Sequence, residues 1–475
     1  MSFMALAPLL AVVAGALAAL LLEAFLKRKD HELSATAAVL SLLAAGFFIV
    51  RSWGLELGYF GGRLALDPLA LLLMAVFVVV AAFIILMSLV YAPRRDINLG
   101  QLCGLLLIAV AGLMIMVSSS DWLVVFLGLE VLSVASYALT GSMRNDRASS
   151  EAAAKYFLMG SFAGAFFVFG LAFLFGTSGA LGFAASLRGG GGPSGLPVAS
   201  AVGLGLILTS LFFKIAIAPF HMWAPDAYEG APTPVTAFLT IAPKAAGLAV
   251  LFRVLAPLLD RGGAASVLGP AVSVAAVLTM FWGNLAALRQ KSVKRLLAYS
   301  AIAHSGYLLV AVVAGDGPGL VFYVIAYLFM NVGAFGVLAA MSRQGVERTS
   351  LADFAGLGRR HPWLAATLAV FLLSLAGFPP TAGFLAKFYV FSAAVAKGHV
   401  PLAVAAVLAS LISVGYYLKV IVAMYMQDAA SETSLEQNDP ALWLVIFLCL
   451  FGVVQLGVWP GNLLTLIRQA FPIPF

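Results

Sequence analysis

Long apolar runs recur along almost the whole chain, and they restrict its fold more than any other feature. Fourteen runs, bounded by charged residues, glycine or proline, reach the roughly 20 apolar residues that one crossing of a bilayer needs. Their approximate limits are 4–26, 33–52, 66–92, 98–118, 121–141, 155–176, 198–220, 233–256, 266–288, 294–313, 318–342, 362–392, 401–426 and 440–462. Hydrophobic residues make up 63% of the chain, against about 45–50% in soluble domains, which excludes a soluble enzyme and a disordered protein. We therefore predict an all-α integral membrane protein with about 14 transmembrane helices.

The distribution of basic residues predicts how these spans are oriented. Of the 27 Lys and Arg residues, sixteen fall in the loops that follow odd-numbered spans, seven in the opposite loops and four inside spans. Lys and Arg accumulate in cytoplasmic loops, so we expect the odd loops in the cytoplasm and both termini on the outer side. The run RQKSVKR, Arg289–Arg295, is interpreted as a cytoplasmic anchor. No nucleic-acid motif accompanies the net charge of +7, which we therefore interpret as a sign of topology.

The sequence shows no motif for a cofactor or a metal ion. It contains no CxxC, HExxH, P-loop or dinucleotide fingerprint. Its two cysteines, Cys103 and Cys449, lie far apart in apolar runs and are expected to act as small apolar residues inside helices. If redox energy drives this protein, the redox centres must therefore lie on a partner.

Six ionisable residues lie inside the predicted spans, where a charge costs several kcal/mol. They are Glu130, Lys214, Lys244, His304, Lys387 and Lys419. A buried lysine changes its protonation state readily, a nearby carboxylate opposes that change, and a histidine can relay a proton. We predict proton transfer through these groups. The alternative is a set of static ion pairs between helices.

The same six residues form two triplets with matching spacing. Their corresponding members are 174, 173 and 175 residues apart, and each pair is separated by five spans. An odd shift in span number places two repeats in opposite orientations across the membrane, as in many transporters. We therefore expect N-terminal helices 1–3 in 1–97, a first five-helix repeat in 98–256, a second, inverted repeat in 257–426, and the last helix in 427–475.

Helix breakers adjoin three of the lysines. Lys214 precedes Pro219, Lys387 follows the GFPP stretch at 377–380, and Lys244 follows Pro243 directly. Proline lacks the backbone N–H and clashes with the preceding turn. Interrupted backbone at membrane depth is tolerated only where protein or water satisfies it. The seventh and twelfth spans are therefore expected to be broken beside a lysine, and Pro243 stands beside Lys244 in the same manner.

Four stretches of the chain carry a family resemblance. They are KIAIAPFHMWAPDAYEGAPTPVTAFLTIAPKAA (214–246), EAAAKYFLMGS (151–161), QKSVKRLLAYSAIAHSGY (290–307) and LAGFPPTAGFLAKFYVF (375–391). Together they resemble the antiporter-like membrane subunits of respiratory complex I over about 65–425. Three features favour the subunit type that has lysine in the broken twelfth span. They are Lys387, Lys244 and the end of the chain soon after the last span. The other types carry glutamate there or a long lateral helix.

The resemblance implies a proton-translocating membrane subunit of NADH:quinone oxidoreductase in the bacterial inner membrane. It implies that Glu130 and Lys214 form the input-side pair, that Lys244 is the central relay and that Lys387 is the exit-side residue, with His304 between the last two. The assignment of Lys419 to proton transfer rests on the repeat spacing alone. FMN, iron–sulfur clusters and quinone are expected on partner subunits, and the partners include a neighbouring antiporter-like subunit and small membrane subunits. A subunit of a related multisubunit sodium/proton antiporter or membrane-bound hydrogenase, and a non-transporting scaffold, are the alternatives.

Overall fold

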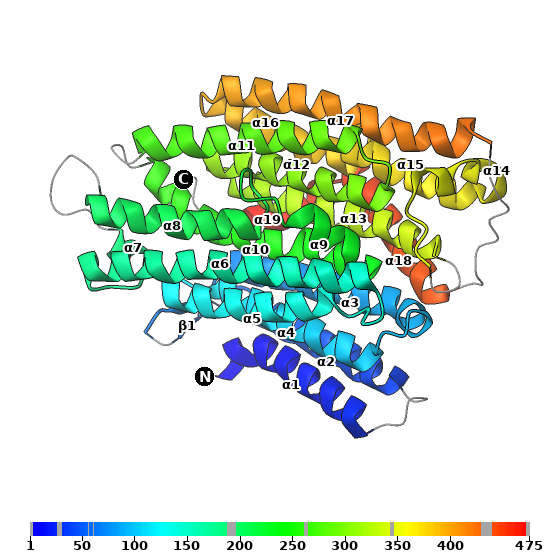
Figure 1. The fold of residues 1–475 in the computed structure, drawn as a ribbon. Coiled ribbons are helices and arrows are strands. Elements are labelled where there is room, and N and C mark those ends of the chain that lie inside the picture. Colours follow the sequence, from blue (N-terminus) through cyan, green and yellow to red (C-terminus); the bar gives the residue numbers. More distant parts are fainter. Residues whose placement is uncertain are drawn as a thin grey trace.

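The protein is a bundle of long helices that lie side by side (Figure 1). The computed structural model describes residues 3–25, 31–55, 57–59, 61–187, 196–260, 265–342, 346–428 and 439–471. Within these ranges, twelve helices are long and apolar enough to cross a membrane. They are α1 (Phe3–Phe25), α2 (His31–Ser52), α3 (Pro68–Arg94), α4 (Leu99–Ser118), α5 (Trp122–Thr140), α6 (Arg147–Ser178), α10 (Thr233–Asp260), α11 (Ala265–Leu288), α12 (Val293–Val313), α13 (Gly317–Ala340), α17 (Val400–Met426) and α18 (Pro440–Val458).

Shorter elements complete the described structure. Three further helices are apolar but too short to cross alone: α8 (Val198–Lys214), α15 (Pro362–Ala376) and α16 (Ala382–Ala396). The remaining helices are α7 (Phe183–Ser186), α9 (Ala224–Gly230), η1 (Leu351–Phe354), α14 (Leu357–Arg360) and α19 (Gly461–Gln469). Strands β1 (Leu57–Tyr59) and β2 (Leu64–Leu66) form an antiparallel hairpin in which Gly58 pairs with Ala65. The predicted all-α membrane fold is confirmed, whereas the count of fourteen spans and the inverted repeats stay predictions.

The helix ends follow local capping, which corrects two predicted boundaries. α6 begins at Arg147 and not at 155, because the Asp146 carboxylate accepts the N–H of Ala148 and starts the helix in its polar segment. α8 ends at Lys214 and not at 220, because the chain turns out of the helix before it reaches Pro219. The twelfth run is broken between α15 and α16, as its glycine and prolines predict.

α10 continues through Pro243 without a break, which corrects the expectation for this proline. Pro243 has no N–H for the carbonyl of Leu239, four residues earlier. The hydroxyl of Tyr228, on α9, donates to that carbonyl at 3.3 Å instead. A side chain from another element therefore replaces the lost backbone hydrogen bond and keeps the helix intact.

Two ends of the bundle differ in charge. The connections that contain Arg94, Arg144 and Arg289 lie together at one end, on the right in Figure 1, and we call this end the basic side. α1 begins and α18 ends at the opposite end. α10, α12 and α13 are almost entirely buried, whereas α1, α2 and α17 expose many large apolar side chains. An outer layer of helices with exposed apolar side chains therefore surrounds the buried centre, and this layer is suited to contact with lipid or with partner subunits.

Candidate functional site

Five of the six predicted ionisable residues lie in the interior of the bundle. Lys214, Lys244, His304 and Lys387 are each at most 5% exposed, and Glu130 is half-buried. They come from five helices, α8, α10, α12, α16 and α5. A fold that buries ionisable groups on so many elements must satisfy each of them with polar partners.

Lys214 lies at the last residue of α8 and is held by hydroxyl groups. Its ammonium donates to Ser133 Oγ at 2.9 Å and to Tyr156 Oη at 3.2 Å. Glu130 lies one turn before Ser133 on α5, close enough to act electrostatically on Lys214. Among the described residues, however, no ion pair within 4.0 Å joins Glu130 to Lys214. The two predicted partners therefore lie near each other without direct contact, and the lysine is hydrogen-bonded to a serine hydroxyl instead.

The break after α8 positions this lysine. Ala216 takes a left-handed conformation with φ of 59°, which turns the chain out of the helix. The indole N–H of Trp223 donates to the carbonyl of Phe213 at 2.8 Å, next to the backbone N–H of Ala216, which donates to the same carbonyl at 3.0 Å. Trp223 also stacks on Tyr156 with ring centres 4.2 Å apart, so the returning chain fixes a partner of Lys214.

Lys244 and His304 lie on facing helices in the centre. The Lys244 ammonium donates to the carbonyl of Ala301 on α12, and Ser305 Oγ donates to the same carbonyl at 3.1 Å. His304, on that helix, places Nδ1 at 2.9 Å from Tyr323 Oη and Nε2 at 3.4 Å from Tyr417 Oη. Both imidazole nitrogens therefore face hydroxyl groups that can donate or accept a proton.

A buried amide holds Tyr307, whose ring lies beside both His304 and Lys387. Asn284, on α11, donates to Tyr307 Oη at 2.9 Å and to the carbonyl of Ala409 at 2.8 Å, and it accepts from Tyr416 Oη at 3.0 Å. The ring centre of Tyr307 is 5.1 Å from the Lys387 ammonium. Asn284 thus sets the orientation of the tyrosine that lies against Lys387.

Lys387 donates hydrogen bonds to the C-terminal end of α15, the first half of the broken helix. Its ammonium donates to the carbonyls of Leu375 (3.0 Å) and Ala376 (2.8 Å), the last two residues of α15, and to Ser410 Oγ (2.8 Å). The last carbonyls of a helix have no partner within it and carry partial negative charge. The site therefore favours a cation at the break between α15 and α16.

Comparisons with known proteins show the family of this chain. Residues 119–413 match the family model described as NADH:quinone oxidoreductase/Mrp antiporter, TM. NADH-quinone oxidoreductase subunit N of Trichlorobacter lovleyi is 40% identical over 461 residues, which cover 96% of this chain and 94% of that protein. The chain belongs to the NADH:quinone oxidoreductase/Mrp antiporter family. This confirms the resemblance to the antiporter-like subunits, and the predicted subunit type is confirmed as subunit N.

Two solved structures share the fold of this antiporter family. A chain of respiratory complex I from Thermus thermophilus with bound aureothin is 33% identical, has a TM-score of 0.83 and is matched over 96% of this chain and 98% of that chain. A chain of the membrane-bound sulfane sulfur reductase, an archaeal respiratory membrane complex, is 25% identical with a TM-score of 0.87, over 99% and 97%. The fold therefore recurs in complexes with different reactions.

Lys419 lies apart from the other five residues of this antiporter-family chain. Its ammonium donates to the carbonyls of Gln290 (3.0 Å) and Leu288 (3.4 Å), where α11 ends on the basic side. A cation at this position satisfies the free carbonyls of a helix end. The repeat spacing that pointed to Lys419 did not place it beside the central groups.

Lys294 and Glu347 are ionisable residues whose burial the sequence did not reveal. Lys294 belongs to the run interpreted as a surface anchor, yet it is 1% exposed and pairs with Glu347 at 2.7 Å. Burial alone would raise the pKa of the Glu347 carboxyl, but the Lys294 ammonium and the hydrogen bonds from Thr233 and Tyr91 outweigh it and lower this pKa below its ordinary value. In the sequence, the one feature that could have pointed to a buried polar site here was the helical spacing of the threonines that follow Thr233.

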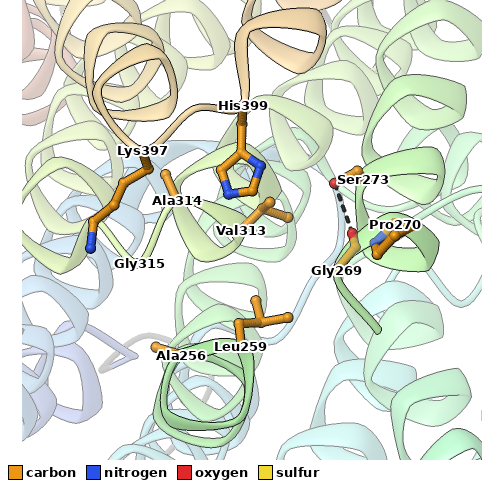
Figure 2. A pocket seen from close by; sticks show the side chains of 10 residues that line it. All are labelled: Ala256, Leu259, Gly269, Pro270, Ser273, Val313, Ala314, Gly315, Lys397 and His399. Atoms are coloured by element: carbon orange, nitrogen blue, oxygen red, sulfur yellow. Dashed lines mark hydrogen bonds between the residues drawn. The ribbon is translucent and has the colours of Figure 1, made fainter. Parts of the chain in front are cut away.

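A cavity of about 400 Å³ lies at the end of α10, α11 and α12 opposite the basic side (Figure 2). The imidazole of His399 points toward Val313 and Leu259 in its wall. Lys397, which also lines it, is ten residues beyond Lys387, or about 15 Å along a helix. Within the described ranges no group of three or more His, Cys, Asp or Glu residues could hold a metal ion.

Proposed function

We propose that the chain is the proton-translocating membrane subunit of a NADH:quinone oxidoreductase. Five residues would carry the proton: Glu130, Lys214, Lys244, His304 and Lys387. The observation that supports this most directly is the chemistry of the lysines' partners. Each lysine donates to hydroxyl or carbonyl oxygens, and among the described side chains none of the three is in an ion pair.

Such partners favour proton transfer over static ion pairing. An ammonium that faces a carboxylate at contact distance is held in its charged form. An ammonium that faces neutral oxygens in an apolar interior can lose its proton without leaving a second charge unpaired. Lys214, Lys244 and Lys387 all have the second kind of environment.

The order of the groups follows their positions in the bundle. Glu130 and Lys214 would exchange a proton across the Ser133 hydroxyl, and Lys244 would receive it in the centre. His304 lies where the charges of both Lys244 and Lys387 act on its ring, so it would pass the proton between them. Lys387, at the break before α16, would release it toward the opposite side.

Replacing Lys214 tests this role. Lys214→Met keeps an unbranched side chain, one atom shorter than lysine, that cannot bind a proton, so proton pumping should fall while the complex still assembles. Lys397→Met is the matched control, because Lys397 is exposed at the far end of α16 and should leave pumping unchanged. Acidification of inverted membrane vesicles, normalised to NADH oxidation, measures the effect. Unchanged pumping in Lys214→Met with a normal amount of complex would refute the proposal.

The family description also covers Mrp antiporters, so a second assignment is a subunit of a multisubunit sodium/proton antiporter or membrane-bound hydrogenase. The lysine at position 387 favours the first assignment. Purification in mild detergent through a tag on this chain, with partners identified by mass spectrometry, distinguishes the two. Co-purifying flavin and iron–sulfur subunits with NADH:quinone activity supports the oxidoreductase, and small membrane subunits alone support the antiporter.

We infer the setting of the chain from the same assignment. FMN, iron–sulfur clusters and quinone would lie on partner subunits, and a neighbouring antiporter-like subunit and small membrane subunits would pack on its exposed apolar helices. In the bacterial inner membrane, the basic side would face the cytoplasm. Both termini would then face outward, which agrees with α1 beginning and α18 ending at the opposite end. Reporter fusions at the two termini test this orientation.

A further inference from the structure

A buried ion pair on the basic side takes no part in the mechanism above. Lys294 donates to Glu347 Oε2 at 2.7 Å and to the carbonyl of Ala231, at the end of α9, at 2.5 Å. Glu347 Oε1 accepts from Thr233 N (3.0 Å), from Thr233 Oγ1 (2.5 Å) and from Tyr91 Oη. The Glu347 side chain is 14% exposed, against 1% for Lys294. Glu347 thus lies at the surface end of a polar cluster that covers the first turn of α10.

A polar face leads from this cluster to the central lysine. Thr233, Thr236, Thr240 and Lys244 are three, four and four residues apart, which places them on one face of α10. All four are at most 1% exposed. Asn331, on α13, donates to Thr240 Oγ1 at 2.5 Å and turns a second polar side chain toward this face.

The length and spacing of this face suit a proton path. From Thr233 to Lys244 is eleven residues, or about 16 Å along a helix. Side chains three or four residues apart have Cβ atoms about 5–6 Å apart, a gap that one water molecule spans with hydrogen bonds of about 2.8 Å. The hydroxyls of Thr236 and Thr240 donate to backbone carbonyls and keep lone pairs that can accept from water.

We propose that Glu347 is a second proton entrance, which supplies Lys244 from the basic side along the threonine face of α10 and bypasses Glu130 and Lys214. This rests on the proposed role of Lys244. A proton from water binds the Glu347 carboxylate as Lys294 moves away. It then passes along hydrated threonine hydroxyls to the neutral amine of Lys244, which becomes an ammonium. Glu347 returns to a carboxylate and pairs with Lys294 again, so one proton is taken up in each cycle.

A purely structural role for these groups makes different predictions. Buried threonines often bond only to their own helix, and an ion pair can hold a loop in place. Thr140, on α5, provides the matched control, since it is also fully buried and also donates to the carbonyl four residues earlier, that of Ser136. Thr240→Val and Thr140→Val each delete a buried hydroxyl that donates to the carbonyl four residues earlier, on and off the proposed path, and the Thr240 hydroxyl in addition accepts from Asn331.

The test uses the whole complex in membrane vesicles, with pumping measured per NADH oxidised. Lys244→Met blocks both entrances and defines the pumping that depends on this chain. Thr240→Val and Lys214→Met should each lower the pumping that depends on this chain about twofold or more. In the double variant Thr240→Val with Lys214→Met, pumping should fall to the level of Lys244→Met. Thr140→Val should match the unmodified complex.

Four outcomes overturn the second entrance. The first is that Thr240→Val does not differ from Thr140→Val in either background, and the second is that Lys214→Met alone falls to the Lys244→Met level. In both cases the proposed function stands. If instead Lys244→Met itself pumps normally, the proposed function fails and the second entrance fails with it. The fourth outcome concerns Glu347 directly.

Glu347 has its own test, since Glu347→Gln alone leaves the buried charge of Lys294 without a counter-charge. The double variant Glu347→Gln with Lys294→Met removes both charges and should restore assembly. The proposal expects reduced pumping in this assembled double variant. Full recovery of both assembly and pumping would show that the pair only holds the loop and would overturn the role of Glu347.

Discussion

Replacing Lys387 separates two roles that one side chain combines. Its ammonium donates to the carbonyls of Leu375 and Ala376 at the end of α15 and to Ser410. Lys387→Met removes these donors and leaves the buried carbonyl of Leu375 without a partner, whereas the carbonyl of Ala376 keeps the Ser410 hydroxyl as a donor at 3.4 Å. At about 1–3 kcal/mol for an unsatisfied group, the free energy of unfolding should fall by about 1–3 kcal/mol. The loss should appear as a lower melting temperature of the purified complex.

Lys387→Gln is the variant that keeps the structure and removes the proton site. The glutamine amide carries two N–H groups, is one bond shorter than lysine and stays neutral, so it can still donate to the α15 carbonyls. We expect it to melt close to the unmodified complex and above Lys387→Met. Its NADH-driven proton pumping, followed with a pH-sensitive dye in vesicles, should nevertheless fall severalfold. Normal pumping in Lys387→Gln would refute the proton role, and equal melting of the two variants would refute the capping argument.

Three further perturbations follow from the structure. Tyr228→Phe should leave the Leu239 carbonyl without a donor and destabilise the protein by about 1 kcal/mol, and an unchanged melting temperature would contradict this. Because the pKa of Glu347 is lowered, its carboxylate should stabilise the fold above the ordinary pKa of about 4.3, and this contribution should be lost as the pH falls through the lowered value. The difference in melting temperature between the unmodified complex and Glu347→Gln should therefore stay the same from about pH 7 to about pH 5 and narrow as the pH falls below the ordinary pKa of about 4.3, and a difference that stays constant below that pH would argue against the pairing. Asn284→Leu should release Tyr307 and reduce pumping per NADH oxidised, whereas an unchanged ratio would show that the amide does not position the tyrosine.

Much of the fold could be predicted because membrane spans are local features. A run of apolar residues must become a helix in lipid, where no water can satisfy its backbone. The predicted limits of α4, α12 and α17 accordingly agree closely with the observed helices. Prolines and glycines also marked the break between α15 and α16 correctly, because they act on the backbone of their own segment.

The candidate site was predictable only in part. Burial of Lys214, Lys244, His304 and Lys387 followed from their position inside apolar runs. The groups that hold them did not, since tyrosines and asparagines in an apolar run carry no charge that would single them out. Asn284 acquires its importance only because α11, α12 and α17 meet around it.

The sequence by itself determined the class of the protein, the positions of most helices and the ionisable residues of its interior. Tertiary structure decided which of these residues meet. It brought the ammonium of Lys419, on α17, to the end of α11 and away from the central groups, and it buried Lys294 beside Glu347, although the sequence put Lys294 in a surface loop. The physical reason is that hydropathy depends on a residue and its chain neighbours, whereas burial and hydrogen bonding depend on segments that are distant in the chain.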